Sequence, residues 1–207
     1  MPKMTHESYK TIKEPSRGLF KDRGSKFLSF AFPVVNENEI KKKLDDLRRE
    51  YHDARHHCYA WVLGRDKENF RANDDGEPSS TAGKPILAQI NKNDLTNVLV
   101  VVVRYFGGTL LGTGGLINAY REAAAMALAD AEIITRTIDE VFTLKFPYTS
   151  LNMVMKVLDL EEVVQTEQDF GAGCSIKIRV PRMKADKVIA RLKIIDNVVV
   201  ENIKGSY

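Results

Sequence analysis

The sequence predicts an α+β protein of two domains, and three observations lead to this prediction. The chain has 207 residues, which is enough for one large domain or two small ones. Residues 99–103 are branched and apolar without exception, and a glycine-rich turn and an alanine-rich helix follow them. After about residue 136 the pattern changes to short alternating strands separated by two helices.

The composition predicts a compact cytoplasmic protein rather than a membrane or secreted one. The hydrophobic fraction of 43% is ordinary for a folded chain, and no apolar run approaches the ~20 residues of a membrane span. Cys58 and Cys174 are too few for a disulfide framework and suit a reducing compartment. The net charge of +3 is compatible with a nucleic-acid partner but too weak to indicate one.

The first elements follow from local patterns. Residues 27–32 alternate between apolar and small or polar positions and end at Pro33, which predicts a strand. Asn36 is the expected N-cap of a helix that runs to about Tyr51, with Glu39 completing a variant of the capping box.

The middle of the chain predicts a buried strand flanked by loops and helices. Residues 55–63 are rich in aromatic and branched side chains and predict a strand, whereas residues 73–85 are too polar for a core and indicate a long loop. Pro85 opens a short helix over residues 86–90. Residues 99–103 have no polar face, so their strand is expected to be buried on both sides. The alanine-rich helix is expected over about residues 116–131.

The last 65 or so residues predict a split βαβ, ferredoxin-like domain, since their order is strand, helix, two strands, helix, strand. We place the boundary near residues 136–137, which gives domains of residues 1–135 and 137–207. Thr149 or Ser150 is the expected cap of the first helix. The predicted elements are strands 143–146, 162–168, 174–180 and 198–200, and helices to about 158 and over about 184–193.

The glycine-rich turn is the sharpest functional signal. A strand that feeds a glycine turn and then a helix presents free backbone N–H groups and the positive helix end at one point, which suits a phosphate. Known nucleotide motifs are not matched, because Thr113 stands at the lysine position of a Walker A and Ile117 at the third glycine of a dinucleotide fingerprint. The alternative is that the glycines only permit tight packing. The candidate anion-binding residues are Arg104, Tyr105, Gly107, Gly108, Gly112, Thr113, Gly114, Gly115 and Lys84.

Two further clusters could carry chemistry. Asp74, Asp75 and Glu77 are close enough in sequence to hold Mg²⁺ or Ca²⁺, although Asp-Gly is also an ordinary turn pair and a structural turn is the simpler interpretation. His56 shares a strand face with Cys58, and we expect it either to donate to the acidic loop or to be a satisfied core histidine. No second Cys/His pair has the spacing of a zinc site, so no metal and no cofactor are expected.

Three stretches together resemble a known family. Residues 54–60, the acidic segment 74–85, and residues 102–116 with Ala119 and Tyr120 occur in the order found in the IMPACT family, specifically its bacterial YigZ-type members. The resemblance covers roughly the first 130 residues. At Ser80, members of the family usually carry glycine.

The resemblance implies a fold for each domain and a role in translation. It implies an N-terminal α/β sandwich like the second domain of a small-subunit ribosomal protein, and a C-terminal domain similar to one in elongation factor G. Eukaryotic relatives regulate translation by binding the scaffold that activates the starvation-responsive initiation-factor kinase.

Three functions are therefore compatible with the sequence. The favoured one is a non-enzymatic, translation-associated factor that binds RNA, the ribosome or a translation factor through the glycine turn and Arg104. The second is a hydrolase or phosphotransferase with His56 as acid or base and a metal held by Asp74, Asp75 or Glu77. The third is a protein-interaction module in which both loops are structural.

Overall fold

The computed structural model describes residues 8–137, 139–171 and 173–203. The chain divides between Arg136 and Thr137 into an N-terminal and a C-terminal unit, and each has a hydrophobic core of its own. The described residues form three sheets and five α-helices, in agreement with the predicted mixture of helices and strands. None of these helices combines the length and the apolar composition needed to cross a membrane.

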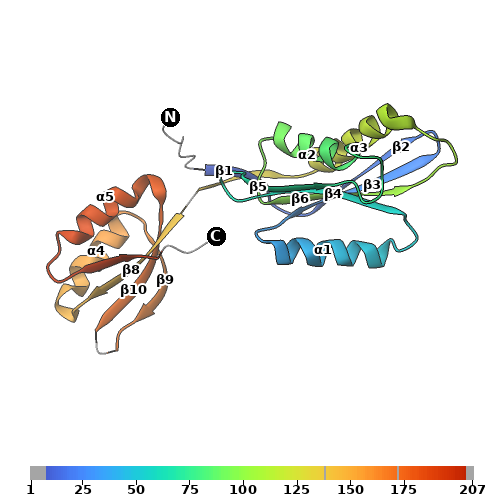
Figure 1. The fold of residues 1–207 in the computed structure, drawn as a ribbon. Coiled ribbons are helices and arrows are strands. Elements are labelled where there is room, and N and C mark those ends of the chain that lie inside the picture. The colour runs from blue at the N-terminus through green and yellow to red at the C-terminus, as the bar shows by residue number, and fades with distance from the viewer. Residues whose placement is uncertain (1–7, 138, 172, 204–207) are drawn as a thin grey trace. The chain divides into compact units, whose positions relative to one another are not determined.

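The N-terminal unit is built on a five-stranded antiparallel sheet of order β2-β3-β6-β4-β5. One helix covers one face of this sheet and two helices cover the other (Figure 1). The strands are β2 (Ser16–Asp22), β3 (Ser25–Pro33), β4 (His56–Leu63), β5 (Asn69–Asn73) and β6 (Val98–Tyr105), with β1 (Ser8–Ile12) and β7 (Ile133–Thr137) forming a separate pair. The helices are α1 (Glu37–Glu50) on one face, and α2 (Gly83–Lys92) and α3 (Gly112–Ala129) on the other.

The central strand β6 is buried on both sides, as its unbroken apolar run predicts. Val100 and Val102 pack into the core beneath α2 and α3, whereas Val101 and Val103 pack into the core beneath α1. Because successive side chains of a strand point to opposite faces, one five-residue run supplies both cores. Each fully buried valine contributes about 1.5–3 kcal/mol relative to an exposed one.

The helix starts show where local patterns succeed and fail. Asn36 caps α1 by accepting a hydrogen bond from the Glu39 N–H (2.9 Å), and the Glu39 carboxylate accepts from the Val35 N–H (3.0 Å), which confirms the predicted cap. The alanine-rich helix, however, begins at Gly112, not near residue 116. The glycine pattern suggests a turn because each glycine weakens a helix by about 1 kcal/mol relative to alanine. Here the buried apolar face further along α3 compensates for that loss.

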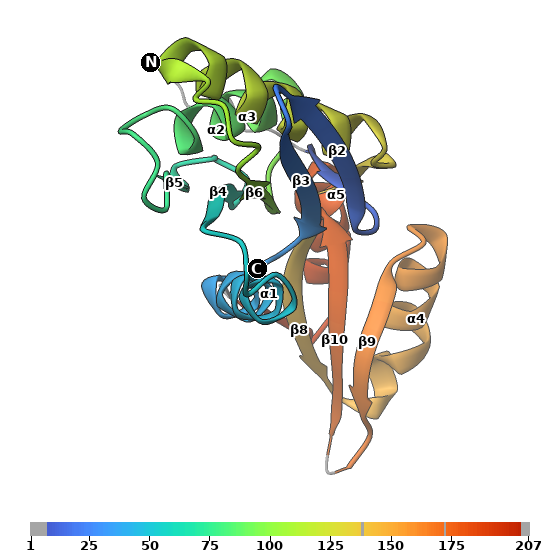
Figure 2. The ribbon, with the colours of Figure 1, turned by 90° about the vertical axis from the view of Figure 1, so that its right-hand side faces the viewer.

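The C-terminal unit has the predicted order of elements. Its four antiparallel strands are arranged β11-β8-β10-β9, and both helices pack on one face (Figures 1 and 2). Ser150 lies at the expected cap position, but its hydroxyl donates to the carbonyl of Asp196 (2.9 Å) and makes no capping hydrogen bond. The elements are β8 (Asp139–Phe146), a 3₁₀ turn (Tyr148–Ser150), α4 (Leu151–Leu160), β9 (Val164–Asp169), β10 (Cys174–Pro181), α5 (Arg182–Lys193) and β11 (Val199–Asn202).

Candidate functional site

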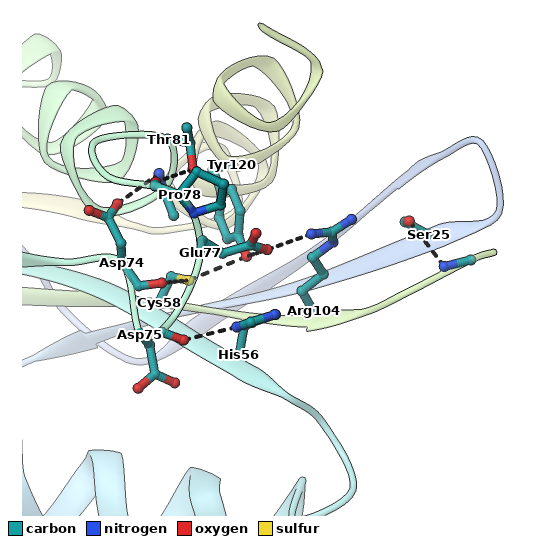
Figure 3. Close-up of polar contacts among 12 residues, drawn as sticks. Ser25, His56, Cys58, Asp74, Asp75, Glu77, Pro78, Thr81, Arg104 and Tyr120 are labelled. Carbon is teal, nitrogen blue, oxygen red and sulfur yellow. Dashed lines mark hydrogen bonds and ion pairs between the residues drawn. The ribbon is translucent and has the colours of Figure 1, made fainter. Parts of the chain in front are cut away.

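The candidate site lies on the face of the N-terminal sheet that α2 and α3 cover. His56, at the start of β4, is directly opposite Arg104 in β6. Between β5 and α2, residues 74–82 form a loop, here called the acidic loop, that lies beside these two side chains (Figure 3). The structure therefore brings together four of the predicted residues from three separate stretches of the chain, namely His56, Asp75, Glu77 and Arg104.

Asp74 is engaged by backbone donors at the start of α2. Its Oδ1 accepts from the N–H groups of Ala82 (3.0 Å) and Gly83 (2.8 Å), and its Oδ2 accepts from the N–H of Ser80 (2.8 Å). Burial opposes ionisation of this carboxyl, but the three N–H donors outweigh it and lower the pKa of Asp74. Asp74 thus caps α2 from outside the helix, and both of its carboxylate oxygens accept hydrogen bonds.

Asp75 contacts both His56 and His57 at the start of β4. Its carboxylate accepts from the backbone N–H of His57 (2.7 Å) and lies 3.7 Å from a guanidinium nitrogen of Arg48. Its backbone carbonyl lies 2.9 Å from Nδ1 of His56. A carbonyl oxygen only accepts, so Nδ1 carries the proton and the Nε2 of neutral His56 has a free lone pair.

Glu77 and Arg104 form a buried ion pair, with 2.6 Å between Oε1 and Nη1 and side chains that are 3% and 8% exposed. Tyr120, on α3, donates its hydroxyl to the same Oε1 (2.8 Å), and the Sγ of Cys58 lies 3.3 Å from that hydroxyl (Figure 3). Burial raises the pKa of both Cys58 and Tyr120. Cys58 therefore remains a thiol rather than a nucleophilic thiolate, and the network is a structural connection between sheet, loop and helix.

Arg104 lies over two aromatic rings. Its guanidinium carbon lies 5.4 Å from the ring centre of Phe27 and 5.9 Å from that of Phe106. Its Nε is buried and has no hydrogen-bond partner among the described residues. The side chain thus links the acidic loop to the start of the glycine-rich segment.

The predicted glycines divide into packing positions and open positions. A Cβ on Gly107 would lie 1.9 Å from the backbone carbon of Gly24, and the Gly107 N–H donates to Ser25 (3.1 Å), so this glycine permits a close approach of two backbones. A Cβ on Gly115 would lie 2.9 Å from Leu111. By contrast, a Cβ on Gly108, Gly112 or Gly114 would meet nothing within 4 Å.

The start of α3 is open to solvent. Gly112, Thr113 and Gly114 are exposed. Leu111 occupies the N-cap position without a side-chain capping bond. No carbonyl or side chain of the described part of the chain, apart from the helix itself, accepts from the N–H groups of these three residues. These three residues therefore form an exposed first turn of α3, whereas Gly107 lies in the preceding loop and packs against Gly24.

Of the two other predicted residues, Tyr105 lies apart from this site and Lys84 lies near Asp74 at the edge of the acidic loop. Tyr105 packs with the core beneath α1, on the opposite face of the sheet from Arg104, and donates its hydroxyl to Asp53 (2.7 Å). That hydrogen bond raises the pKa of Tyr105 to about 12. Lys84 is exposed in the first turn of α2.

A metal centre has no support from the arrangement of side chains. Among the residues that the structure describes, no group of three or more His, Cys, Asp or Glu side chains could hold a metal ion. Asp74 and Glu77, two of the three carboxylates considered as possible ligands, bind backbone amides and Arg104. Sequence reasoning missed the linking role of Tyr120, whose spacing with Leu116 and Ala123 on the buried face of α3 was the available signal.

The fold and the site together define a class of protein, a two-unit chain of helices and strands. Its first unit carries an acidic loop bound to Arg104 and a helix with an exposed, glycine-rich start. The family model described as the Impact N-terminal domain matches residues 23–128, a range that contains both features. The chain belongs to the IMPACT family.

Similar proteins extend over both units. IMPACT family member YigZ of Escherichia coli K12 is 35% identical over 170 residues, which are 81% of this chain and 83% of that protein. IMPACT family member YvyE of Bacillus subtilis 168 is 35% identical over 71% of this chain and 68% of its own. The crystal structure of a hypothetical protein superposes on this chain with a TM-score of 0.74 and 31% sequence identity. The match covers 96% of this chain and 98% of that protein.

Proposed function

We propose that this protein is a cytoplasmic, non-enzymatic, translation-associated regulatory factor that binds RNA, alone or in the ribosome, at the start of α3. Membership of the IMPACT family supports a translation-related regulatory role. The two cysteines, which are buried free thiols, are consistent with a reducing compartment.

The observation that carries the proposal is the open start of α3. Gly112, Thr113 and Gly114 are exposed residues, and their N–H groups belong to the first turn, at the positive end, of an 18-residue helix. Such a helix end attracts anions through its unpaired N–H groups and its dipole. Because these glycines lack side chains, a phosphate can approach the backbone closely.

A pair of variants at one position tests this proposal. Thr113→Glu adds a negative charge where the phosphate would bind, whereas Thr113→Gln has nearly the same shape without the charge. A labelled oligouridylate followed by fluorescence anisotropy is expected to lose roughly tenfold in affinity with Thr113→Glu and less than about twofold with Thr113→Gln. Equal binding by both variants, or no binding of RNA by the unaltered protein, would refute the proposal.

One observation favours a second candidate, a catalytic role for His56. Its Nδ1–H donates to a backbone carbonyl of the acidic loop, which leaves Nε2 as a potential general base. A hydrolase or phosphotransferase of this kind is expected to lose turnover in His56→Gln while it remains folded. Phosphate release from a panel of phosphorylated substrates, compared between the two proteins, distinguishes this candidate from a purely binding function.

We further propose that the C-terminal unit has a ferredoxin-like fold. We also propose that the N-terminal unit has a fold like the second domain of a small-subunit ribosomal protein. The βαββαβ order and the strand order β11-β8-β10-β9 support the first assignment. The uncovered face of this sheet carries Ser175, Lys177 and Arg179, of which Lys177 pairs with Glu167 (2.8 Å). This polar face is a candidate second contact surface.

A further inference from the structure

The hairpin of β2 and β3 concentrates positive charge. Residues 16–26 contain four cations, Arg17, Lys21, Arg23 and Lys26, and one carboxylate, Asp22. The net charge of this hairpin is therefore +3, the same as the net charge of the whole chain. The hairpin is therefore a local concentration of positive charge that can attract an anionic partner.

The register brings two of these charges face to face. Lys21 is directly opposite Lys26 across the hairpin. Like charges at directly opposed positions destabilise an antiparallel pair. Within the described part of the chain, neither lysine forms an ion pair that would relieve the repulsion, nor does Arg17. Because the opposed lysines cost stability and have no carboxylate partner within the described part of the chain, we expect an anionic partner outside it.

These side chains lie on a part of the sheet that α1 leaves uncovered. Phe20 and Phe27 pack beneath α2 and α3, so the alternating neighbours Lys21 and Lys26 point to the other face. On that face the core beneath α1 is formed from β3, β4 and β6, and none of the described residues of β2 belongs to it. Leu19, at the centre of this face of β2, is 46% exposed.

The basic hairpin is continuous with the glycine-rich segment. The hairpin turn at Gly24 packs against Gly107 so closely that a Cβ on Gly24 would lie 2.7 Å from the Gly107 carbonyl oxygen. Both loops lie at the same end of the sheet (Figure 1), and β2 and β3 run side by side toward it (Figure 2). Because α3 and the two lysines lie on opposite faces of the sheet, a chain of phosphates that continues from the start of α3 would reach the lysines around this end of the sheet.

We propose that the basic hairpin, meaning Arg17, Lys21, Arg23 and Lys26, binds the phosphate backbone of single-stranded RNA that continues from the start of α3. This inference rests on the proposed function and extends it to a second surface. Protein interfaces are depleted in lysine and enriched in aromatic residues and methionine. The exposed face of this hairpin instead carries cations together with Leu19 and the half-buried Leu28 opposite it, which favours a polyanion. A flexible single strand can follow the twisted hairpin, whereas the narrow major groove of an RNA duplex cannot admit it.

The test compares two double variants that each remove two positive charges. Lys21→Gln/Lys26→Gln neutralises the opposed lysines, and the matched control Arg71→Gln/Lys92→Gln neutralises two exposed cations on β5 and α2, elsewhere in the same unit. With a labelled oligouridylate, the hairpin variant is expected to lose roughly tenfold in affinity, and the slope of log affinity against log salt is expected to decrease by about 1.4. The control is expected to change neither quantity appreciably.

A charge reversal separates binding from folding. Lys21→Glu converts the repulsive pair with Lys26 into an attractive one, so the melting temperature is expected to rise while RNA affinity falls further than with glutamine. A merely structural role for Lys21 would move stability and binding in the same direction.

The outcomes distinguish failure of this inference from failure of the proposed function. If the unaltered protein binds RNA and Thr113→Glu weakens binding but the hairpin variant does not, the hairpin is not part of the surface and the proposed function stands. If the unaltered protein binds no RNA, both this inference and the proposed function are wrong. If polyglutamate displaces the labelled oligouridylate as effectively as unlabelled RNA does, the surface binds an acidic protein segment instead. If an RNA duplex binds more tightly than the single strand, the single-strand assignment is wrong.

Discussion

The carboxylate of Glu77 and the guanidinium of Arg104 are 2.6 Å apart, and both side chains are more than nine-tenths buried. The two residues are separated by 27 positions along the chain. Their pairing fastens the acidic loop to the central strand of the N-terminal sheet. It also explains why the loop, although rich in polar residues, has a defined structure.

Removing one partner of this ion pair is expected to be costly. Glu77→Ala leaves the Arg104 charge buried without compensation, and a loss of about 3–5 kcal/mol in the free energy of unfolding is expected from urea denaturation. The double variant Glu77→Ala/Arg104→Met should recover part of this loss. For comparison, Glu132→Ala breaks the exposed pair with Lys13, and a much smaller change is expected because solvent screens this pair. Similar losses for the buried and exposed pairs would contradict this account.

The cap formed by Asp74 predicts a dependence of stability on pH. Since the folded state lowers the pKa of Asp74, its contribution is fully present above the ordinary carboxyl pKa and is lost as the pH falls through the lowered value. Asp74→Ala is expected to reduce the free energy of unfolding by about 1–2 kcal/mol near neutral pH, as for other helix caps.

The pH profile provides the control. Urea denaturation between about pH 2 and 7 should show a smaller acid-induced loss for Asp74→Asn than for the unaltered protein, because asparagine keeps an acceptor but does not titrate. An unchanged profile would show that Asp74 is not the group responsible.

Ser80 occupies a backbone conformation that favours glycine, with φ at +66°. A side chain in this region costs about 1–2 kcal/mol, whereas the extra freedom of glycine in the unfolded chain costs about 0.5–1 kcal/mol. Ser80→Gly is therefore expected to stabilise the protein by about 0.5–1 kcal/mol, measured by thermal or urea unfolding. The neighbouring Ser79, whose φ is not positive, is the matched position, and Ser79→Gly should be neutral or destabilising. A gain at both positions would refute the conformational explanation.

The glycines near α3 are expected to respond differently to alanine. Gly107→Ala inserts a methyl group where the Gly24 backbone lies, and a loss of about 1–3 kcal/mol in stability is expected. Gly114→Ala meets open space within the first turn of α3, and a gain of about 0.5–1 kcal/mol is expected from helix propensity. Differential scanning calorimetry of the two variants checks both signs, and a loss at Gly114 would show that the helix start is packed rather than open.

Burial of His57 provides a second, independent pH effect. Burial lowers the pKa of His57, and its Nε2 is buried without a partner among the described residues. The neutral form is therefore favoured in the folded state, so stability is full above the ordinary histidine pKa near 6.5 and decreases as the pH falls toward the lowered value. His57→Phe should flatten the stability profile over this range, without affecting the region in which Asp74 titrates. A profile identical to that of the unaltered protein would contradict the assignment.

Much of the fold could be predicted from local patterns. The doubly buried strand β6 follows from a run without a polar face, and the α1 cap follows from Asn36 and Glu39 at the required spacing. The opposite orientations of Cys58 and Tyr59 follow from strand alternation, and the two residues lie in different cores. These features depend on neighbours within a few residues, which is the range over which periodicity is informative.

The candidate site could be predicted only in part. Sequence patterns singled out the acidic loop, His56 and the glycine-rich segment, but not the partner of each charged group. They left open whether Asp74 binds a metal or a backbone, and they did not indicate that Lys21 and Lys26 oppose each other.

The order of elements in the C-terminal unit, the two-sided burial of β6 and the family itself were determined by the sequence alone, because each depends on spacing along the chain. Only the tertiary structure decided that the acidic loop is bound to Arg104 and to the start of α2, and that the start of α3 is left open. The reason is that the energy of a charge or a free amide depends on which groups lie within a few ångströms of it, and folding brings those groups from distant parts of the chain.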